Sequence, residues 1–378
     1  MKSNHLQQLA TLGQSIWLDC MRRDLMENGG LRRLIKVDGI RGMTSNLAIL
    51  EKAISGGYDY DADIRSMALD EMDAAAIYEA LTHHDVRTAA DEFRPLYDAT
   101  EGADGYAGIE VNPHLSHDTD GTVAEARRLW AALDRPNVLI KIPATDEGIP
   151  AIRQLIGEGI NVNVTHLFGL RRYRQAVEAY IAGIEDRLFK SKSIRHVTSV
   201  ASFFLGGIDT LVDQLLDKII AQDGGNATLA RQIHGCAAIA VAQAAYKIYK
   251  ETYAGDRFKG LAEWGGRPQR IAWAGTDTKN PDYSDVKYVE ALIGPDTIST
   301  VTAETLNAYR DHGDPKLRLE HNVENAFHLL GRLNELDIGI DTVTRQIEDD
   351  GIDKLTKQSD RVLKALALKT PRYSLEQI

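Results

Sequence analysis

The stretch NVLIKIPATDEG, residues 137–148, begins with an apolar run that is typical of a buried strand. Lys141 interrupts this run, and burial of an ammonium group is costly unless the charge is paired or neutralised. Side chains alternate between the two faces of a strand, so Leu139 and Lys141 share one face. Ile140 and Ile142 share the other. The sequence therefore predicts a strand with one polar side chain on an otherwise apolar face.

Apolar stretches of similar length recur along the chain and predict eight strands. They are SIWLDC (15–20), GMTSN (42–46), YAGIEVN (106–112), NVLIKIP (137–143), NVNVTHL (161–167), HVTSVASFF (196–204), RIAWAG (270–275) and DTISTVT (296–302). Helix-like segments lie between most of them, for example residues 118–133, 167–188 and 227–253. Alternating strands and helices indicate parallel β/α units.

Eight β/α units in about 300 residues predict a (β/α)8 TIM barrel. The competing fold is a doubly wound open sheet, which would carry a glycine-rich phosphate loop after an early strand. The segment GEGINVN instead precedes a strand. Residues 319–369 read as helices without a further strand. We therefore expect one α/β barrel domain over residues 1–378, in which residues 319–378 form a helical C-terminal extension.

The composition is that of an ordinary soluble enzyme. The chain has 378 residues, of which 43% are hydrophobic and 26% charged, and its net charge of −11 argues against a basic nucleic-acid-binding face. We expect no membrane partner, because no apolar run approaches the roughly 20 residues that span a bilayer and the N-terminus lacks a signal-peptide core. The only two cysteines, Cys20 and Cys236, favour a cytoplasmic protein without disulfides. No Cys/His cluster has the spacing of a metal site.

Strand alternation places a set of polar side chains on the faces that would point into the barrel. They are Asp19, Glu110, Lys141, Asn163 and Thr165, with Asn46 at the end of the second strand and Ser202 on the same face as Phe204. Barrel enzymes place catalytic groups at the C-terminal ends of the strands. A buried polar network that only fills the barrel would explain any single residue equally well. It explains the whole set poorly, because such a network has a desolvation cost that apolar packing avoids.

The chemistry of this set is that of a covalent enzyme. A buried lysine held as the free amine can attack a ketone and form a Schiff base. Asp19 and Glu110 are the acids that could move protons during dehydration and carbon–carbon cleavage. Thr165 could hold a water against Glu110, and the amides of Asn46 and Asn163 could fix substrate hydroxyls. No metal or cofactor is needed, because the iminium is the electron sink.

Several longer segments resemble transaldolase, in particular its longer bacterial form. They are GQSIWLDC, GIRGMTSNLAILEKAI, GIEVNPHLSHDTDGT, LIKIPATDEGIPAIRQLIGEGINVNVTHLF, SVASFF and GTDTKNPDYSDVKYVEALIGPDT. The resemblance follows the same order over almost the whole chain. It implies a metal-independent and cofactor-independent transferase of the class I aldolase type, and a place in the pentose phosphate pathway. It would move a dihydroxyacetone unit from sedoheptulose 7-phosphate or fructose 6-phosphate to glyceraldehyde 3-phosphate or erythrose 4-phosphate.

The resemblance also implies a role for each polar residue. Lys141 matches the Schiff-base lysine, and Asp19 matches the acid/base of carbon–carbon cleavage. Glu110 and Thr165 match the pair that activates the catalytic water. The dihydroxyacetone moiety would be held or lined by Asn46, Asn163, Ser202 and Phe204. Only small-molecule sugar partners are implied, and we expect a monomer or a homodimer.

The sequence departs from the family where the substrate phosphate should bind. Gly207 stands where a phosphate-binding arginine is usual, and Gly275 replaces a serine. Asp277 adds a carboxylate, whereas Lys279 keeps a cation near the site. Loss of an arginine removes a bidentate phosphate contact, and a nearby aspartate would repel the dianion.

Two explanations of these departures stay open. Arg171, Arg267 or Arg270 could rebuild the phosphate site, although each is also readable as a surface charge. Alternatively, the enzyme has altered head-group specificity, for an unphosphorylated or differently charged sugar. Two further hypotheses are a class I aldolase acting on free dihydroxyacetone and a non-catalytic sugar-binding descendant. The last would have lost the proton-handling residues, and none of them is lost.

Overall fold

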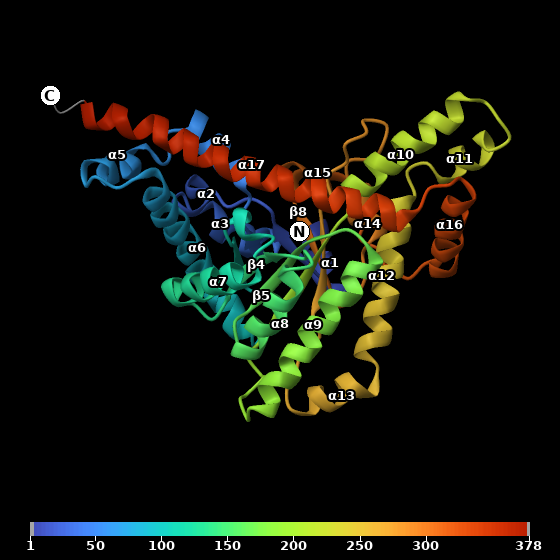
Figure 1. Cartoon of the computed structure of the whole chain (residues 1–378), viewed down its shortest axis with the longest axis horizontal. Coiled ribbons are helices and arrows are strands. Elements are labelled where there is room, and N and C mark those ends of the chain that lie inside the picture. Colours follow the sequence, from blue (N-terminus) through green and yellow to red (C-terminus); the bar gives the residue numbers. More distant parts are fainter. Residues whose placement is uncertain (1–3, 376–378) are drawn as a thin grey trace.

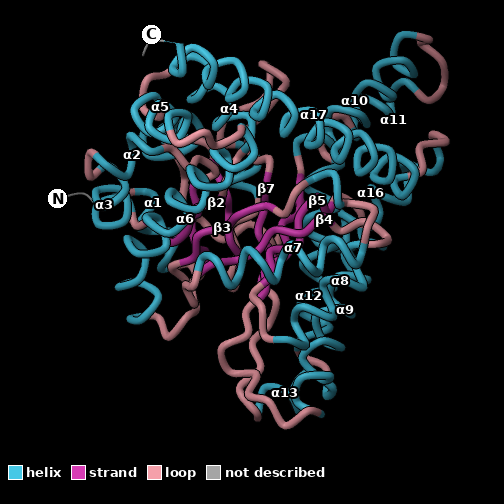
Figure 2. The backbone as a smooth tube through the Cα atoms, turned by 60° about the vertical axis from the view of Figure 1, so that its left-hand side comes forward, coloured by secondary structure: helices cyan, strands magenta, loops and turns pink. Residues whose placement is uncertain are grey.

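The computed structural model describes residues 4–375, and its centre is a closed barrel of parallel strands surrounded by helices (Figures 1 and 2). The strands are β1 Gln14–Leu18, β2 Ile40–Thr44, β3 Tyr106–Glu110, β4 Val138–Pro143, β5 Val162–Leu167, β6 Ser199–Phe204, β7 Arg270–Ala274 and β8 Thr297–Val301. They pair in chain order, and β8 closes the barrel against β1. The predicted (β/α)8 barrel is confirmed.

Helices connect the strands and extend beyond them at both ends of the chain. The helices up to β5 are α1 His5–Thr11, α2 Arg23–Glu27, α3 Gly30–Arg33, α4 Leu47–Gly56, α5 Asp61–Leu69, α6 Ala74–Ala99, α7 Thr119–Leu133 and α8 Gly148–Glu158. Those after β5 are α9 Leu170–Phe189, α10 Gly206–Ala221, α11 Ala227–Ile233, α12 Ala237–Tyr253, α13 Asp256–Glu263, α14 Lys287–Ala291, α15 Ala303–His312, α16 Val323–Glu335 and α17 Ile340–Leu375.

The structure shortens or divides several predicted elements, and two of these differences have a clear local cause. Residues 227–253 form two helices, because the chain turns at Gly235, whose positive φ of +72° ends a helical run. The carboxylate of Asp213 accepts the Gly235 N–H at 2.8 Å and fixes this turn. The second strand ends at Thr44 rather than Asn46, because the Asn46 side chain accepts hydrogen bonds at the start of α4.

The predicted inward face of the strands is confirmed. One apolar cluster fills the barrel interior and consists of Trp17, Tyr106, Leu139, Val200, Ala272 and Ile298. The opposite strand faces join the main core against the helices; Phe203, for example, packs edge-on against Tyr173 of α9. Since Leu139 lies inside the barrel, Lys141 two residues later also points inward, toward the C-terminal end.

The long helix α17 crosses the C-terminal end of the barrel, drawn in red along the top of Figure 1. A Cβ atom at Gly207, at the start of α10, would lie 3.2 Å from Ile347 of α17. Farther along, Gly351 of α17 approaches His166 and Phe168, which are at the end of β5. The C-terminal half of α17 then packs on α4, α5 and α6. The predicted helical tail without a further strand is confirmed over its described residues.

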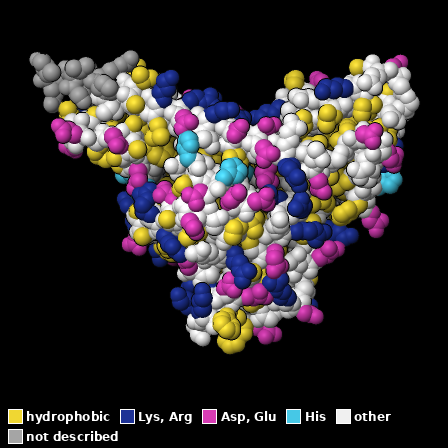
Figure 3. Space-filling model, viewed as in Figure 1, with side chains coloured by type: hydrophobic (Ala, Val, Ile, Leu, Met, Phe, Trp, Pro, Cys, Tyr) yellow, Lys and Arg dark blue, Asp and Glu magenta, His cyan; other side chains and the backbone are white. Residues whose placement is uncertain are grey.

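Charges of both signs are interspersed on the face shown in Figure 3 and do not form a continuous basic surface there. Within residues 4–375, no helix combines the length and apolarity needed to cross a membrane. The same residues contain no group of three or more His, Cys, Asp or Glu side chains placed to hold a metal ion. Cys20 and Cys236 are free thiols.

Candidate active site

Lys141 of β4 is buried, and its Nζ atom has two polar contacts. Its Nζ atom lies 2.8 Å from Oε1 of Glu110, the last residue of β3, and donates a hydrogen bond of 2.9 Å to the carbonyl oxygen of Ser45. The neighbouring inward position on β3 is Gly108, where a Cβ atom would lie 3.5 Å from Cδ of Lys141. The lysine therefore extends over a position without a side chain toward a carboxylate partner, which offsets the cost of its burial.

Asp19 follows β1 and lies in the same group of charges. The side-chain amide of Asn46 donates to its Oδ2 at 3.1 Å. Burial raises the pKa of the Asp19 carboxyl to about 6, although the Lys141 charge and the Asn46 hydrogen bond oppose that rise. Asn46 is fixed at its other end, because its Oδ1 accepts from the backbone N–H groups of Ala48 and Ile49 in α4. Asp19 is thus a carboxyl group that changes protonation close to neutral pH.

Glu110 and Thr165 each keep a buried oxygen free. Oε2 of Glu110 and Oγ1 of Thr165 have no hydrogen-bond partner among the described residues. A cavity of about 20 Å³ beside Glu110 is lined by Ser45, Asn46 and Tyr78, among others, and has room for about one water. Thr165 is not among its lining residues. The two free oxygens are available for a small polar molecule.

Asn163 and Ser202 are brought together between β5 and β6. The hydroxyl of Ser202 donates to Oδ1 of Asn163 at 2.7 Å, which orients the asparagine side chain. Phe204, two residues beyond Ser202 on the same face, stacks on His166 with ring centroids 5.4 Å apart. Asp19, Asn46, Glu110 and Phe204 lie at or just beyond the C-terminal ends of their strands, whereas Asn163, the second residue of β5, lies deeper in the barrel.

His166 belongs to this group, although the sequence pattern did not indicate it. Strict alternation assigns His166 to the outside of the barrel, between the inward positions of Thr165 and Leu167. In the structure the pairing of β5 with β6 shifts register between Val164 and Leu167, and His166 has a positive φ of 55°. Burial lowers the pKa of its imidazole to about 4, so the ring is neutral at pH 7. No alternation pattern could have revealed this residue, because the irregular backbone re-aims it.

The predicted phosphate cation is not free. Lys279 forms an ion pair with Asp277, two residues earlier, and about two thirds of its side chain is exposed. The Asp277 charge contributes to raising the pKa of Asp19, which places it beside the same group of charges. Asp277 is therefore part of the electrostatic surroundings of Asp19 and is less exposed than Lys279.

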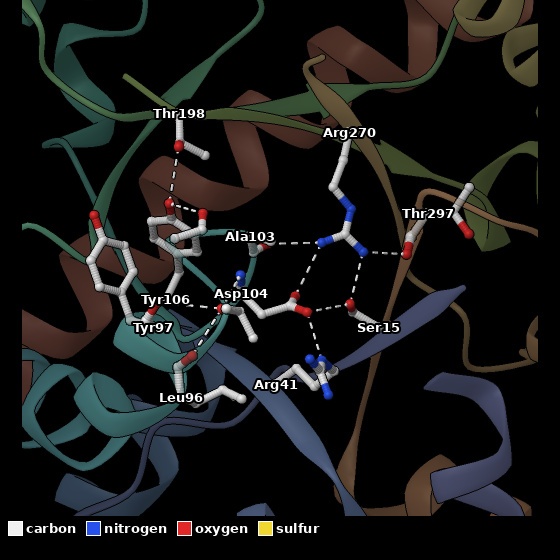
Figure 4. Close-up of polar contacts among 12 residues, drawn as sticks. Ser15, Arg41, Leu96, Tyr97, Ala103, Asp104, Tyr106, Thr198, Arg270 and Thr297 are labelled. Carbon is white, nitrogen blue, oxygen red and sulfur yellow. Dashed lines mark hydrogen bonds and ion pairs between the residues drawn. The ribbon is translucent and has the colours of Figure 1, made fainter. Parts of the chain in front are cut away.

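Arg270 and Arg267 cannot rebuild a phosphate site, and that part of the sequence hypothesis was wrong. Arg270 is the first residue of β7, so it lies at the N-terminal end of the barrel (Figure 4). Its guanidinium group contacts Asp104 at 3.1 Å and Oγ of Ser15 at 2.7 Å. Arg267 donates to the carbonyl oxygen of Glu101 at the same end. The predicted strand at 270–275 already implied this position, because Arg270 begins that strand and Arg267 precedes it, so both lie at the N-terminal end of a parallel barrel.

Arg171 lies at the C-terminal end, near the start of α9. It lines a cavity of about 370 Å³ together with Arg345 of α17. Acidic side chains share this cavity, and Arg172 beside Arg171 pairs with Asp146 and Glu348. Arg171 is the predicted arginine that the structure places at the end of the barrel where Lys141 points.

Comparison with known proteins gives relatives along the whole chain. Residues 16–366 match the profile of the family described as "Transaldolase/Fructose-6-phosphate aldolase". The "Transaldolase" of Trichodesmium erythraeum is 44% identical over 378 residues, which cover 99% of this chain and all of that protein. "Transaldolase 2" of Nostoc sp. is 43% identical over 99% of this chain and all of that protein. "Transaldolase 2" of Nostoc punctiforme is 42% identical over 97% of both chains.

Proposed function

The chain belongs to the transaldolase/fructose-6-phosphate aldolase family, and we propose on that premise that Lys141 is the residue that forms its Schiff base with a ketose. The observation that carries this assignment is the buried placement of Lys141 beside Glu110, in the same group of charges as Asp19. Glu110 and Asp19 are then both placed to transfer protons beside Lys141.

The steps follow from these positions. Lys141 first gives a proton to Glu110, whose Oε1 is 2.8 Å from Nζ. The free amine then adds to the ketose carbonyl, and the carbinolamine loses its hydroxyl as water to give the iminium. Glu110 is the nearest carboxylate to Nζ and shuttles the protons of this dehydration. Its free Oε2, with the free hydroxyl of Thr165, is suited to hold the water that later hydrolyses the intermediate.

Carbon–carbon cleavage requires a base in addition to the iminium. Asp19 accepts the proton of the substrate hydroxyl, the adjacent carbon–carbon bond breaks, and the electron pair moves toward the iminium nitrogen as the aldose leaves. A carboxyl with a pKa of about 6 is mostly ionised at neutral pH, and is more basic than an ordinary aspartate. In the reverse direction the same group returns the proton when the bound three-carbon unit attacks a new aldose.

Four further residues would hold the three-carbon unit. Asn46 and Asn163 have side-chain amides whose orientation is fixed by hydrogen bonds. Ser202 supplies a hydroxyl and Phe204 an aromatic wall near them. These contacts would keep the intermediate bound until an acceptor arrives, as transfer requires.

The comparisons favour transaldolase over the alternative of altered head-group specificity, since relatives of that name align over nearly the full chain. The family acts on sugar phosphates. We infer that the donors are sedoheptulose 7-phosphate or fructose 6-phosphate and that Lys279 contacts the phosphate at the rim. Because Asp277 competes for that cation, the phosphate contact is weaker than a buried arginine would provide.

Borohydride reduction in the presence of fructose 6-phosphate, followed by intact-mass analysis, tests the proposal. We expect the mass of a reduced three-carbon adduct in the wild-type protein and its loss in Lys141→Met. Lys192→Met, at an exposed lysine, is the matched control and should retain the adduct. Absence of an adduct from the wild type with any ketose phosphate would refute the Schiff-base function.

A further inference from the structure

The end of β5 holds a histidine in an uncommon backbone conformation. His166 has a φ of 55°, in the left-handed region, which non-glycine residues adopt at a cost. The register shift between Val164 and Leu167 accompanies this conformation. Bulges of this kind often re-aim a side chain next to an active site. Here the result is that the imidazole stacks on the inward-facing ring of Phe204 instead of pointing to the outer helices.

Packing does not account for the choice of histidine. The ring is buried and surrounded by Phe204, Phe168 and the α17 backbone at Gly351. Its Nδ1 atom has no hydrogen-bond partner among the described residues. An unsatisfied buried polar atom is unfavourable, so an apolar side chain would stabilise the fold better at this position.

The position of the ring indicates which part of a substrate it would meet. Asn163 and Ser202, the residues assigned to the three-carbon unit, lie deeper in the barrel than His166 and Phe204, which are nearer the C-terminal strand ends. A ketose anchored on Lys141 must extend from the three-carbon unit toward this end. The carbons that leave as the aldose therefore lie beside His166.

We propose that His166 is a further catalytic-site residue, whose neutral imidazole hydrogen-bonds a hydroxyl group of the aldose half of the substrate. This rests on the proposed function, because it places the sugar by its bond to Lys141. A neutral ring suits a hydroxyl group and not the phosphate, since the pKa of about 4 leaves it uncharged at pH 7. The ionisable side chains that act on it are Glu110 and Lys141.

Variants at position 166 test this role. His166→Gly fits the positive φ and removes the ring, and His166→Leu fills the space without a polar atom. His166→Asn tolerates the left-handed backbone and keeps a donor and an acceptor. For each we would measure the yield of the borohydride-trapped three-carbon adduct, the KM and kcat for an aldose phosphate acceptor, and the melting temperature.

We expect the Gly and Leu variants to raise the acceptor KM about tenfold, the size of one lost hydrogen bond, with the adduct yield unchanged. His166→Asn should restore the KM to within about threefold of wild type. His196→Asn, at an exposed histidine before β6, should change nothing. Should His166→Leu fail to fold, His166→Gly carries the same expectation.

Two results would overturn the proposal while leaving the Schiff-base function intact. One is an acceptor KM within twofold of wild type in His166→Gly, together with a normal adduct. The other is no improvement of His166→Asn over His166→Gly, which would show that the ring only fills space. A wild-type protein that forms no adduct would instead overturn the proposed function and this inference together.

Discussion

Nζ of Lys141 and Oε1 of Glu110 lie 2.8 Å apart, and less than a tenth of either side chain is exposed. The pair gives Glu110 direct access to the nitrogen at which the carbinolamine forms and loses water. We predict that Glu110→Gln slows Schiff-base formation by about 100-fold, the usual scale for loss of a general acid–base group. The amide oxygen of glutamine still accepts from Lys141, so the protein should fold.

The measurement for Glu110→Gln is the rate at which the borohydride-trapped adduct appears after mixing with fructose 6-phosphate. Glu147→Gln, at a partly exposed glutamate after β4, is the control and should react at the wild-type rate. Equal rates for Glu110→Gln and wild type would contradict the assignment.

Asp19 should set the acidic limb of the pH–rate profile. Cleavage needs its ionised form, so kcat/KM should fall as the pH drops below about 6. His166 does not compete for this assignment, because its pKa is about 4. Asp19→Asn should keep only a residual activity, and the pH profile of that activity should lack the acidic limb. A limb of unchanged midpoint in that variant would show that another group titrates.

The same carboxyl should affect stability in a pH-dependent way. Its pKa in the folded protein is above the ordinary value of 3.8, so ionisation disfavours the folded state as the pH rises through about 6. Asp19→Asn should therefore raise the free energy of unfolding by about 3 kcal/mol at pH 7.5 and by about 1 kcal/mol at pH 4.5. Urea denaturation at both pH values measures this. A gain of equal size at the two pH values would mean that ionisation is not its cause.

Asp277 should weaken phosphate recognition through its ion pair with Lys279. Asp277→Asn frees the lysine and removes a negative charge, so we predict that the KM for fructose 6-phosphate falls about threefold. The KM for unphosphorylated fructose should not change, and the gain should shrink at high salt because Lys279 is exposed. Asp282→Asn, in the same loop, is the control. An equal change for both sugars would exclude an effect on the phosphate.

The fold and the regular part of the site were predictable because both follow from period-two alternation. Leu139 and Lys141 share a face in the sequence and in the barrel, and the same test located Asp19, Glu110 and Asn163. Failures occurred where the backbone leaves that pattern or where position along the strand matters. His166 turns inward through a positive φ. Arg270 was misplaced although the predicted strand begins at this residue, which puts it at the N-terminal end of the barrel and away from Lys141.

Asp104 should stabilise the end of the barrel opposite to Lys141. Its carboxylate contacts Arg41 at 2.6 Å, Arg270 at 3.1 Å and the hydroxyl of Ser15 at 2.9 Å, as Figure 4 shows. Asp104→Asn leaves two guanidinium groups without a carboxylate, so we predict a loss of about 3 kcal/mol in unfolding free energy. Asp353→Asn, at an exposed position of α17, is the control and should be close to neutral.

The rate of adduct formation distinguishes this structural role from a catalytic one. Folded Asp104→Asn protein should form the borohydride-trapped adduct at the wild-type rate, because Lys141 lies at the other end of the barrel. A slower reaction at unchanged stability would contradict a purely structural role for Asp104.

Gly351 should be the position at which α17 is held close to His166. Glycine in a helix interior is less favourable than alanine by about 1 kcal/mol, so Gly→Ala at an open site stabilises. Gly331 in α16 is such a site, because a Cβ atom there would meet no neighbour within 4 Å among the described residues. A Cβ atom at Gly351 would instead lie 3.2 Å from Nδ1 of His166.

We predict that Gly331→Ala raises the melting temperature and that Gly351→Ala does not, because the added methyl group at position 351 pushes α17 away from the imidazole. The same displacement should raise the acceptor KM of Gly351→Ala only. Equal stabilisation by both substitutions, with an unchanged KM, would show that α17 does not fix the position of His166.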